Sequence, residues 1–425
     1  MTLLILSLIV LMALLGAPVF VVISAAAIFG FHMADIPSPA LVVDVYNKFS
    51  NSPVLYTIPL FTFGGFILAE SKASVRIVHF SRAILGWLPG GLAIVSLVAC
   101  ALFTAFTGAS GVTIIALGGL LFPALIAEHY SDRFSLGLLT SSGSLGLLFP
   151  PSLPIIIYGV VAETSIPQLF AAGLLPGVFL IIILAGYSVV SGETMKVVRQ
   201  RFSFRDVIKA ASRAKWEILI PAIIGVGIFG GFVTLGEVAA IIVVYVLIVE
   251  AGIHREISLR QIPAIMKRSM VLVGGILIIL GSALGLTNYM IDAEIPMIIL
   301  TAMERFVTSR FIFLIALNGF LLIVGCLMDI YSALLVVVPL ILPIAESYGV
   351  HPVHLGIIFL TNLEIGYMTP PVGMNLFISS FRFNRPVIEL YRAAIPFILM
   401  LLIGLIIITY WPELSMGIVK YFSIQ

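Results

Sequence analysis

The chain has 425 residues, of which 61% are hydrophobic and only 10% are charged, and its net charge is +2. A soluble domain carries about 25% charged residues, so this composition excludes a soluble globular protein and predicts an all-α polytopic membrane protein. The sequence contains no G-x-x-x-x-G-K-[ST] motif, which excludes ATP hydrolysis by a P-loop.

The stretch from Met1 to Phe31 is apolar and lacks a basic start. It is too long for a signal peptide, so we predict a retained first span with a bend near Gly16 and Pro18. The approach to the next apolar segment is predicted to be cytoplasmic by the positive-inside rule, because it carries Lys72, Arg76 and Arg82. Residues 1–90 are assigned to N-terminal scaffold helices.

A polar cluster interrupts the next apolar segment. The letters TGASG, from Thr107 to Gly111, separate two apolar limbs, and the second limb is predicted to end at Pro123. Limbs of about 14 residues cannot each cross the ~30 Å hydrocarbon core, so we predict a re-entrant helical hairpin with its tip near the midplane. The letters SGSLGLLFPPSLP follow and predict a broken transmembrane helix. Residues 91–168 form this first transport-domain repeat.

The middle of the chain carries the charges that orient the protein. After a span containing Pro176, seven basic and two acidic residues between Gly192 and Trp216 predict a cytoplasmic arm. The stretch from Trp216 to Glu250 is predicted to leave the cytoplasm and return as a tight pair of helices. The acidic letters IDAEIP are placed outside. Residues 169–310 are assigned to scaffold helices with this arm.

The second half of the chain repeats the first. The letters GCLMDIYS and LEIGYMTPPVGMNLF reproduce the polar tip and the break. Four prolines and a glycine recur at one constant offset in the numbering: Pro123/Pro343, Pro150/Pro370, Pro151/Pro371, Pro176/Pro396 and Gly146/Gly366. Five predicted crossings separate the two hairpins, an odd number, so the repeat is inverted. The second transport-domain repeat is residues 311–385, and residues 386–425 form a C-terminal scaffold helix.

Broken helices and hairpin tips free backbone groups that hydrocarbon cannot satisfy. Freed carbonyls and hydroxyls suit a hard cation such as Na⁺, and freed N–H groups suit a carboxylate. We predict two Na⁺ sites with the substrate between them. The first comprises Thr107, Gly108, Ser110, Ser142, Ser144 and Gly146. The second comprises Gly325, Met328, Asp329, Ser332, Gly366 and Thr369. The substrate candidates are Ser110, Gly111, Ser142, Gly143, Asn362, Thr369 and Asn375.

The letters TGASG, GSLGLLFPPSLPIIIYG, GFVTLGEVAA and GYMTPPVGMNLF, in this order, resemble the large membrane subunit of the TRAP (tripartite ATP-independent periplasmic) transporters over essentially the whole chain. The resemblance implies Na⁺-driven uptake of an organic acid, of the sialic acid or C4-dicarboxylate class, by an elevator mechanism in the bacterial inner membrane. It also implies a periplasmic substrate-binding protein and a small membrane subunit, which we expect as a separate chain. Neither an organic cofactor nor a nucleic acid is expected.

Several alternatives stay open. The main one is a Na⁺- or H⁺-coupled carboxylate carrier of the same hairpin architecture that needs no binding protein. The letters GASG would make Ser110 the nucleophile of an intramembrane protease, but the six histidines all lie in polar stretches or at predicted helix ends. A passive channel would also accommodate re-entrant loops. Glu237 is predicted to cap a short helix. Asp329 and Glu364 either serve the second site or pair locally.

Overall fold

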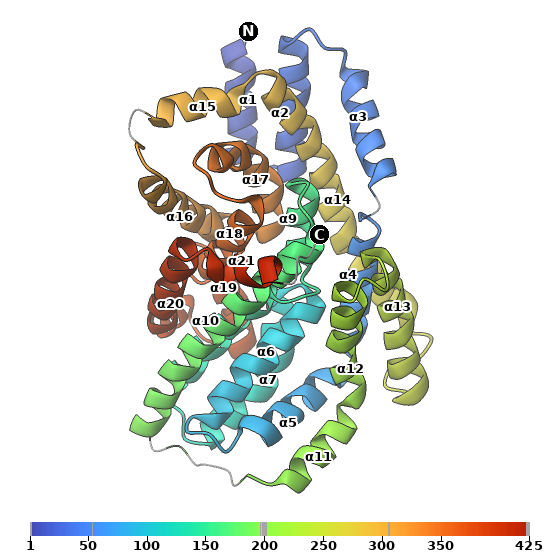
Figure 1. Ribbon diagram of the computed structural model, residues 1–425, viewed down its shortest axis with the longest axis vertical. Coiled ribbons are helices and arrows are strands. Elements are labelled where there is room, and N and C mark those ends of the chain that lie inside the picture. The colour runs from blue at the N-terminus through green and yellow to red at the C-terminus, as the bar shows by residue number, and fades with distance from the viewer. Residues whose placement is uncertain (1, 53, 196, 198–201, 305–306, 422–425) are drawn as a thin grey trace.

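The computed structural model describes residues 2–421 except 53, 196, 198–201 and 305–306, and within these ranges the regular elements are helices (Figure 1). Seven helical segments are long and apolar enough to cross a membrane, and a bent helix pair would make an eighth span. The seven are α7 (Ser110–Ala127), α10 (Ile166–Thr194), α13 with η3 (Leu235–Ile253), α14 (Ile262–Asp292), α16 (Arg310–Leu327), α17 (Ile330–Ser347) and α20 (Val387–Tyr410). This architecture confirms the predicted all-α polytopic fold.

The N-terminal region differs from the single bent span that the sequence predicted. Two helices, α1 (Thr2–Leu14) and α2 (Val19–Met33), pack against each other, and α2 also packs along α14 (Figure 1). Gly16 between them has a φ of +81°, and Pro18 precedes α2, so the chain turns more sharply than at a proline kink. The chain continues through α3 (Ser38–Asn51), α4 (Thr57–Glu70) and α5 (Ala73–Leu85).

The first predicted hairpin consists of α6 (Gly91–Thr107) and α7. Its limbs have 17 and 18 residues, longer than predicted, because α7 continues through Pro123 to Ala127. A proline removes one backbone hydrogen bond, and neighbouring helices make that loss tolerable inside a membrane protein. The predicted break follows, between α8 (Asp132–Ser142) with the short 3₁₀ turn η1 (Leu145–Leu148) and α9 (Leu153–Val161), and the two sides are bent by 46°.

The second hairpin, α16 and α17, has two limbs of 18 residues, and α17 likewise continues past Pro343. The second break separates α18 (Pro352–Gly366) from α19 (Met374–Phe383). Both Pro-Pro peptide bonds, Pro150-Pro151 and Pro370-Pro371, are cis. In Figure 1, α6 and α7 occupy the lower half of the molecule, whereas α16 and α17 occupy the upper half. The two hairpins therefore enter from opposite ends, as the inverted repeat predicts.

The predicted arm contains α11 (Phe204–Arg213), and the central pair is α12 (Lys215–Ile224) with the π-helical turn η2 (Gly225–Phe229) and α13 (Leu235–Leu247) with η3 (Ile248–Ile253). Two further short helices are α15 (Ile295–Glu304) and α21 (Glu413–Tyr421). Glu237 caps α13 as predicted, because its carboxylate accepts a hydrogen bond from the Thr234 N–H at 2.7 Å.

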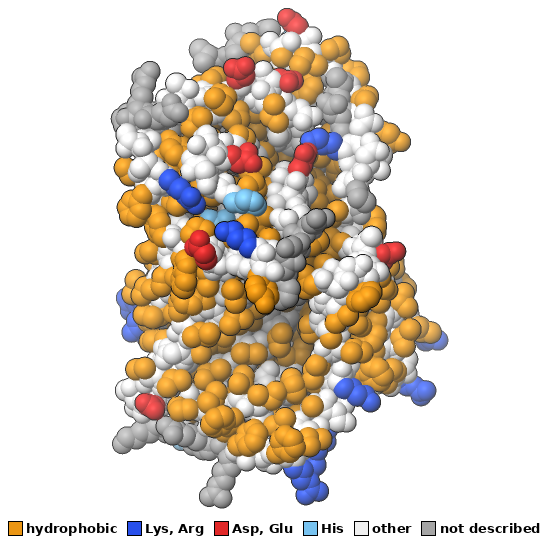
Figure 2. Space-filling view, in the orientation of Figure 1, with side chains coloured by type: hydrophobic (Ala, Val, Ile, Leu, Met, Phe, Trp, Pro, Cys, Tyr) orange, Lys and Arg blue, Asp and Glu red, His pale blue; other side chains and the backbone are white. Residues whose placement is uncertain are grey.

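Charge is distributed unevenly along the long axis of the molecule. Figure 2 shows Lys and Arg side chains at the lower end, where Figure 1 places α11 and few acidic side chains are visible, whereas in the upper half basic side chains are mixed with most of the acidic ones. Hydrophobic side chains cover much of the face between the two ends. By the positive-inside rule, the lower end is the cytoplasmic end.

Candidate functional site

The tips of the two hairpins meet inside the molecule. The Tyr331 hydroxyl, at the start of α17, donates a hydrogen bond to the Gly108 carbonyl at the first tip, at 2.9 Å. The Ile330 N–H donates to the Tyr367 hydroxyl in the second break. The first of these bonds joins the two halves of the chain, and together they bring both tips and the second break to one place.

A cavity of about 500 Å³ lies where the tips meet. Residues 109–111 of the first tip and 329–331 of the second both line it, and these triplets are equivalent at the constant offset of the repeat. Leu147 and Tyr367, which share the same offset, line it as well. The cavity therefore lies on the pseudo-twofold axis of the repeat. Phe66 from α4 and Leu272 from α14 complete its wall.

Three helices begin at this cavity: α7 at Ser110, α17 at Ile330 and α19 at Met374. The first turn of a helix has N–H groups without intrahelical partners and a partial positive charge, and both attract anions. The residues before α7 and α19, Ala109 and Gly373, make no side-chain capping bond. In α19, however, the N–H groups of Asn375 and Leu376 already donate to the carbonyls of Tyr367 at 3.0 Å and Gly373 at 2.8 Å, so α7 is the helix whose N-terminus is open to a ligand.

The N-terminus of α17 is occupied instead by its own cap. The Asp329 carboxylate accepts hydrogen bonds from the N–H groups of Tyr331 at 3.0 Å and Ser332 at 3.1 Å, and the Ser332 hydroxyl also donates to it. Asp329 therefore pairs with the adjacent backbone, one of the two roles considered from the sequence. Among the described residues that line the cavity, it is the one charged side chain.

Each break packs against the hairpin of its own repeat through a glycine. A Cβ atom added to Gly146 would lie 2.2 Å from the carbonyl oxygen of Ala101 in α6. A Cβ atom added to Gly366 would lie 2.6 Å from Cα of Gly325 in α16. Any larger residue would push the break away from the hairpin, which explains why glycine occupies both of these equivalent positions.

The residues predicted for the first Na⁺ site lie around the first tip and break. Thr107 is buried and its hydroxyl has no hydrogen-bond partner among the described residues, whereas those of Ser142 and Ser144 donate to carbonyls one turn earlier. Gly108 and Ser110 line the central cavity, and Gly146 packs on α6. The unpaired Thr107 oxygen is the feature that a bound cation would satisfy.

The residues predicted for the second Na⁺ site surround the second tip. The Thr369 hydroxyl donates to the Ile365 carbonyl at 2.9 Å, and Met328 is the residue that ends α16. Gly325 and Gly366 are in the contact described above, and Asp329 and Ser332 are bonded to each other. Glu364 is fully buried in α18, and neither of its carboxylate oxygens has a hydrogen-bond partner among the described residues.

Three of the predicted substrate residues come together and four do not. Ser110 and Gly111 line the cavity, and the Ser110 hydroxyl donates to Asn375 Oδ1 at 2.8 Å. The Asn362 amide instead donates to Asn318 Oδ1 of α16 at 2.7 Å. The other three residues lie outside the cavity lining: Ser142, Gly143 and Thr369.

Sequence reasoning missed the residues that hold these parts together. Tyr331 and Tyr367 were inside the quoted motifs, and a tyrosine at mid-membrane depth needs a partner for its hydroxyl, which was the available signal. The Thr104 hydroxyl, in α6, donates to the Gly143 carbonyl at 2.7 Å and is 2.6 Å from that of Thr113, tying the first hairpin to the first break. Nothing local in the sequence marked these two threonines.

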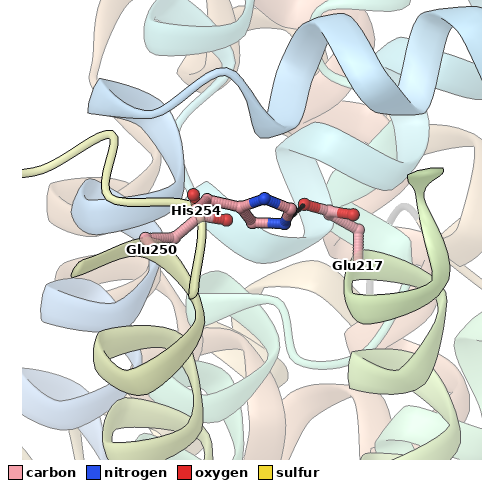
Figure 3. Close-up of side chains that lie close together, drawn as sticks. All are labelled: Glu217, Glu250 and His254. Carbon is pink, nitrogen blue, oxygen red and sulfur yellow. Dashed lines mark ion pairs between the residues drawn. The ribbon is translucent and has the colours of Figure 1, made fainter. Parts of the chain in front are cut away.

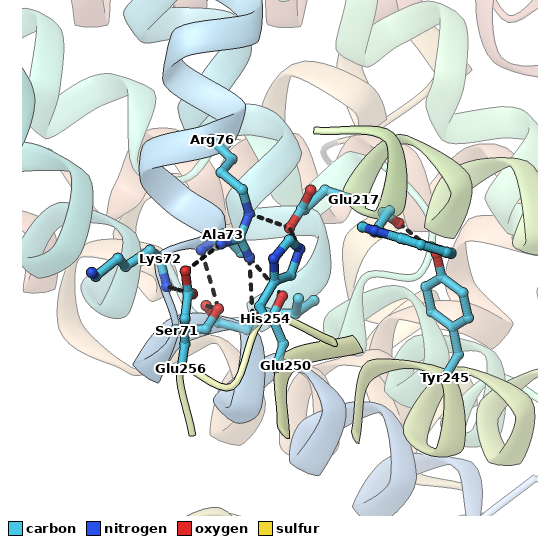
Figure 4. A network of polar contacts seen from close by, with 11 residues as sticks. Ser71, Lys72, Ala73, Arg76, Glu217, Tyr245, Glu250, His254 and Glu256 are labelled. Carbon is cyan, nitrogen blue, oxygen red and sulfur yellow. Dashed lines mark hydrogen bonds and ion pairs between the residues drawn. The ribbon is translucent and has the colours of Figure 1, made fainter. Parts of the chain in front are cut away.

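A second cluster of polar side chains lies nearer the cytoplasmic end. Ligand atoms of Glu217, Glu250 and His254 lie within 4.8 Å of one another, close enough for a metal ion (Figure 3). Arg76 of α5 already occupies this place: its guanidinium contacts Glu217 at 2.6 Å, Glu250 at 2.8 Å and Glu256 at 2.7 Å (Figure 4). A metal ion there would face the guanidinium charge, so the cluster is a structural ion-pair network that joins α5 to α12 and η3.

The comparisons with known proteins agree with this architecture. Residues 5–414 match the family described as "Tripartite ATP-independent periplasmic transporter, DctM component". The chain is 34% identical over 372 residues to the C4-dicarboxylate TRAP transporter large permease protein DctM of Pseudomonas aeruginosa, covering 87% of each chain. It is 31% identical to the ectoine/5-hydroxyectoine TRAP transporter large permease protein UehC of Ruegeria pomeroyi, covering 96% of each.

Two further matches are more restricted, one in the length covered and one in sequence identity. The isethionate TRAP transporter permease protein DctMQ of Oleidesulfovibrio alaskensis is 32% identical, and the match covers 94% of this chain but 64% of that longer protein. The crystal structure of the Alcanivorax borkumensis YdaH transporter superposes with a TM-score of 0.63 over 89% of this chain and 90% of that one. At 11% identity, this second match supports the fold alone.

These relatives are transporter permeases, so the chain is a transport component and not an enzyme, which removes the intramembrane protease alternative. In agreement, the Ser110 hydroxyl contacts an asparagine, Asn375. Both hairpins and both breaks lie within the residues that match the family. The chain therefore belongs to the family of large membrane subunits, the DctM component, of the tripartite ATP-independent periplasmic transporters.

Proposed function

We propose that this subunit imports an organic acid, of the sialic acid or C4-dicarboxylate class, across the bacterial inner membrane. Uptake is driven by Na⁺ and requires a periplasmic binding protein, with a small membrane subunit supplied as a separate chain. The observation that carries the proposal is the uncapped N-terminus of α7, at Ser110, which faces the central cavity. It supplies positive partial charge where no basic side chain of the described residues lines the wall.

The substrates named for the relatives support the same class of ligand. C4-dicarboxylates, isethionate and ectoine each carry an acidic group, and backbone N–H groups can donate hydrogen bonds to any of these groups. The DctM relative has about the length of this chain, which supports a small subunit that is a separate chain. The DctMQ relative is longer, which suggests that in that protein the small subunit is fused to the large one.

The position of the cavity supports an elevator movement. Its lining comes from both hairpin tips, from the two broken helices, and from single residues of α4 and α14. We assign the two hairpins and two broken helices, residues 91–168 and 311–385, to the moving domain. The remaining segments, residues 1–90, 169–310 and 386–425, form the scaffold. The substrate would then be carried along the scaffold wall formed by Phe66 and Leu272.

Reconstitution in proteoliposomes tests the function directly. The chain is combined with its small subunit and a cognate binding protein, and accumulation of a radiolabelled organic acid is measured with and without an inward Na⁺ gradient. We expect accumulation that requires both the gradient and the binding protein. Accumulation without the binding protein would identify the simpler carrier instead. Equilibration without accumulation would identify a passive channel and contradict the proposal.

Replacing Thr107 with the isosteric valine tests the first Na⁺ site. The Thr107 hydroxyl has no partner among the described residues, so Thr107→Val should leave stability in Na⁺-free buffer unchanged or slightly raised. If the hydroxyl is a ligand, the Na⁺ concentration for half-maximal uptake should rise about tenfold, the order expected from losing one hydrogen-bond-strength contact to a charge. Thr62→Val in α4 is the control, because its buried hydroxyl already donates to the Ile58 carbonyl. An unchanged Na⁺ dependence in Thr107→Val would remove Thr107 from the site.

A further inference from the structure

A basic pocket of about 280 Å³ lies between α5 and α11 at the cytoplasmic end. Arg82 and His79 line it from α5, and Lys209 and Arg213 line it from α11. One acidic residue, Asp206, also lines it. Arg76 reaches the pocket as well, but its charge is already matched by three glutamates. The lining therefore favours an anion.

The available positive charge is concentrated on α11. Arg82 is paired with Glu128 at 2.5 Å, so its charge is shared. Lys209 and Arg213 make no ion pair with the carboxylates of the described residues. They are four residues apart in α11, so they lie one above the other on the same helix face. An anion between α5 and α11 would contact both.

The opposite face of α11 is apolar, and its two largest side chains, Phe204 and Ile208, are exposed. Phe204, Val207, Ile208 and Ala211 follow helical spacing, and no residue of α11 is buried. Phe204 is 68% exposed and Ile208 is 55% exposed. A short helix with one basic and one apolar face is typical of a helix that lies in the membrane interface, with its apolar face in the acyl region.

Aromatic side chains next to α11 mark the level of the membrane surface. Trp87, at the end of α5, is 47% exposed and contacts Phe202 edge-on, with ring centroids 6.0 Å apart. At the other end of the arm, the Lys215 ammonium lies 4.8 Å from the ring centroid of Trp216. Tryptophan and lysine are enriched at the headgroup level of membranes. The basic pocket therefore lies at headgroup depth on the cytoplasmic side.

We propose that this pocket binds the phosphate of an anionic phospholipid of the inner leaflet. Lys209 and Arg213 contact the phosphate, and the acyl chains enter the same layer as the apolar face of α11. Basic pockets between helices on the cytoplasmic side are suited to such headgroups, and the two unmatched charges supply the attraction. The lipid would attach the arm to α5, because the pocket is formed by both helices.

The test compares two variants that remove the same number of charges from the arm. Lys209→Gln/Arg213→Gln removes both from the pocket, whereas Arg205→Gln/Lys215→Gln removes two that do not line it. Each full-length protein is placed in detergent micelles that contain phosphatidylcholine, and its affinity for added phosphatidylglycerol is measured by native mass spectrometry. We expect the pocket variant to bind about 25-fold more weakly, from about fivefold per basic residue, and the control variant to bind nearly as the wild type does.

Three results would overturn the proposal. Equal losses of phosphatidylglycerol affinity in the two variants would show that the arm attracts negative charge in general and has no specific lipid site. Unchanged affinity in both variants, with normal folding by circular dichroism, would place the lipid elsewhere. Inorganic phosphate or glycerol 1-phosphate binding as tightly as phosphatidylglycerol would identify a soluble phosphate compound as the occupant. Each outcome is independent of transport activity.

Discussion

Replacing Arg76 with alanine is expected to lower the free energy of unfolding by about 3–5 kcal/mol, the cost of removing one partner from a buried ion pair. The Arg76 side chain is 12% exposed, and those of Glu217 and Glu250 are 2% and 0% exposed. Without the guanidinium, these carboxylates would remain buried next to one another with no compensating cation. Equilibrium unfolding in mixed detergent micelles measures the loss.

A matched control separates this effect from the loss of any arginine. Arg268 pairs with Glu70 at 2.7 Å, but both side chains are largely exposed, at 59% and 42%. Such surface pairs contribute about 0–1 kcal/mol, so Arg268→Ala should change stability little. Adding Glu250→Gln to Arg76→Ala should recover part of the loss, because it removes one unpaired charge. Equal losses in Arg76→Ala and Arg268→Ala would contradict the network described here.

The same network makes stability depend on pH in a defined direction. Burial opposes ionisation of Glu256, but the Lys72 N–H and the Arg76 guanidinium outweigh it and hold the pKa of Glu256 below its usual value. A lowered folded-state pKa means that the stabilisation is present above the ordinary pKa of glutamate and is lost as pH falls through the folded-state pKa. Arg76→Ala should therefore flatten the acid side of the stability profile.

Gly366→Ala is expected to have the largest effect on transport. The added Cβ would lie 2.6 Å from Cα and from the carbonyl carbon of Gly325, and backbone atoms cannot rotate away as side chains can. The second break must then separate from the tip of α16, at a cost of roughly 1–3 kcal/mol or more. Because the predicted cation ligands lie on both sides of this contact, we expect uptake to fall to background and Na⁺ binding to weaken in calorimetry.

A glycine in the same hairpin serves as the control. Gly319 lies in α16, and a Cβ there would meet nothing within 4 Å. Gly319→Ala should therefore retain wild-type uptake. This result would show that losing a glycine in α16 does not by itself impair transport. Should Gly366→Ala transport as well as Gly319→Ala, the close contact between the break and the hairpin would have no functional importance.

The repeating elements were predictable from the sequence because they depend on local chemistry. Paired prolines interrupt a helix wherever they occur, and the constant offset of Pro150 and Pro370 revealed both breaks and their relation. The orientation of the protein in the membrane was also predictable from local features, because the positive-inside rule needs only the number of basic residues in each loop. The polar letters at the tips likewise indicated where each hairpin turns.

The contacts between distant segments were not predictable. Arg76 meets Glu217 and Glu250, which are 141 and 174 residues away, and no local pattern marks such partners. The cavity shape depends on Tyr331 and Tyr367, whose hydroxyls bond across the interface between the hairpin tips and the second break. The bend near Gly16 and Pro18 was predicted, but the reversal into two packed helices was not, because a glycine close to a proline fits either a bend or a reversal.

The cap on α17 has an evolutionary consequence. Two identical half-molecules around a twofold axis would offer a ligand two identical ends, and the ligand could bind either way round. Joining the halves in one chain allowed Ala109 and Asp329, which are equivalent positions, to become different. One end of the cavity kept its open helix terminus, and the other acquired a carboxylate that repels anions. In this view, duplication supplies the symmetric frame, and the differences between the two tips, with Asp329 among them, would give a bound ligand a direction.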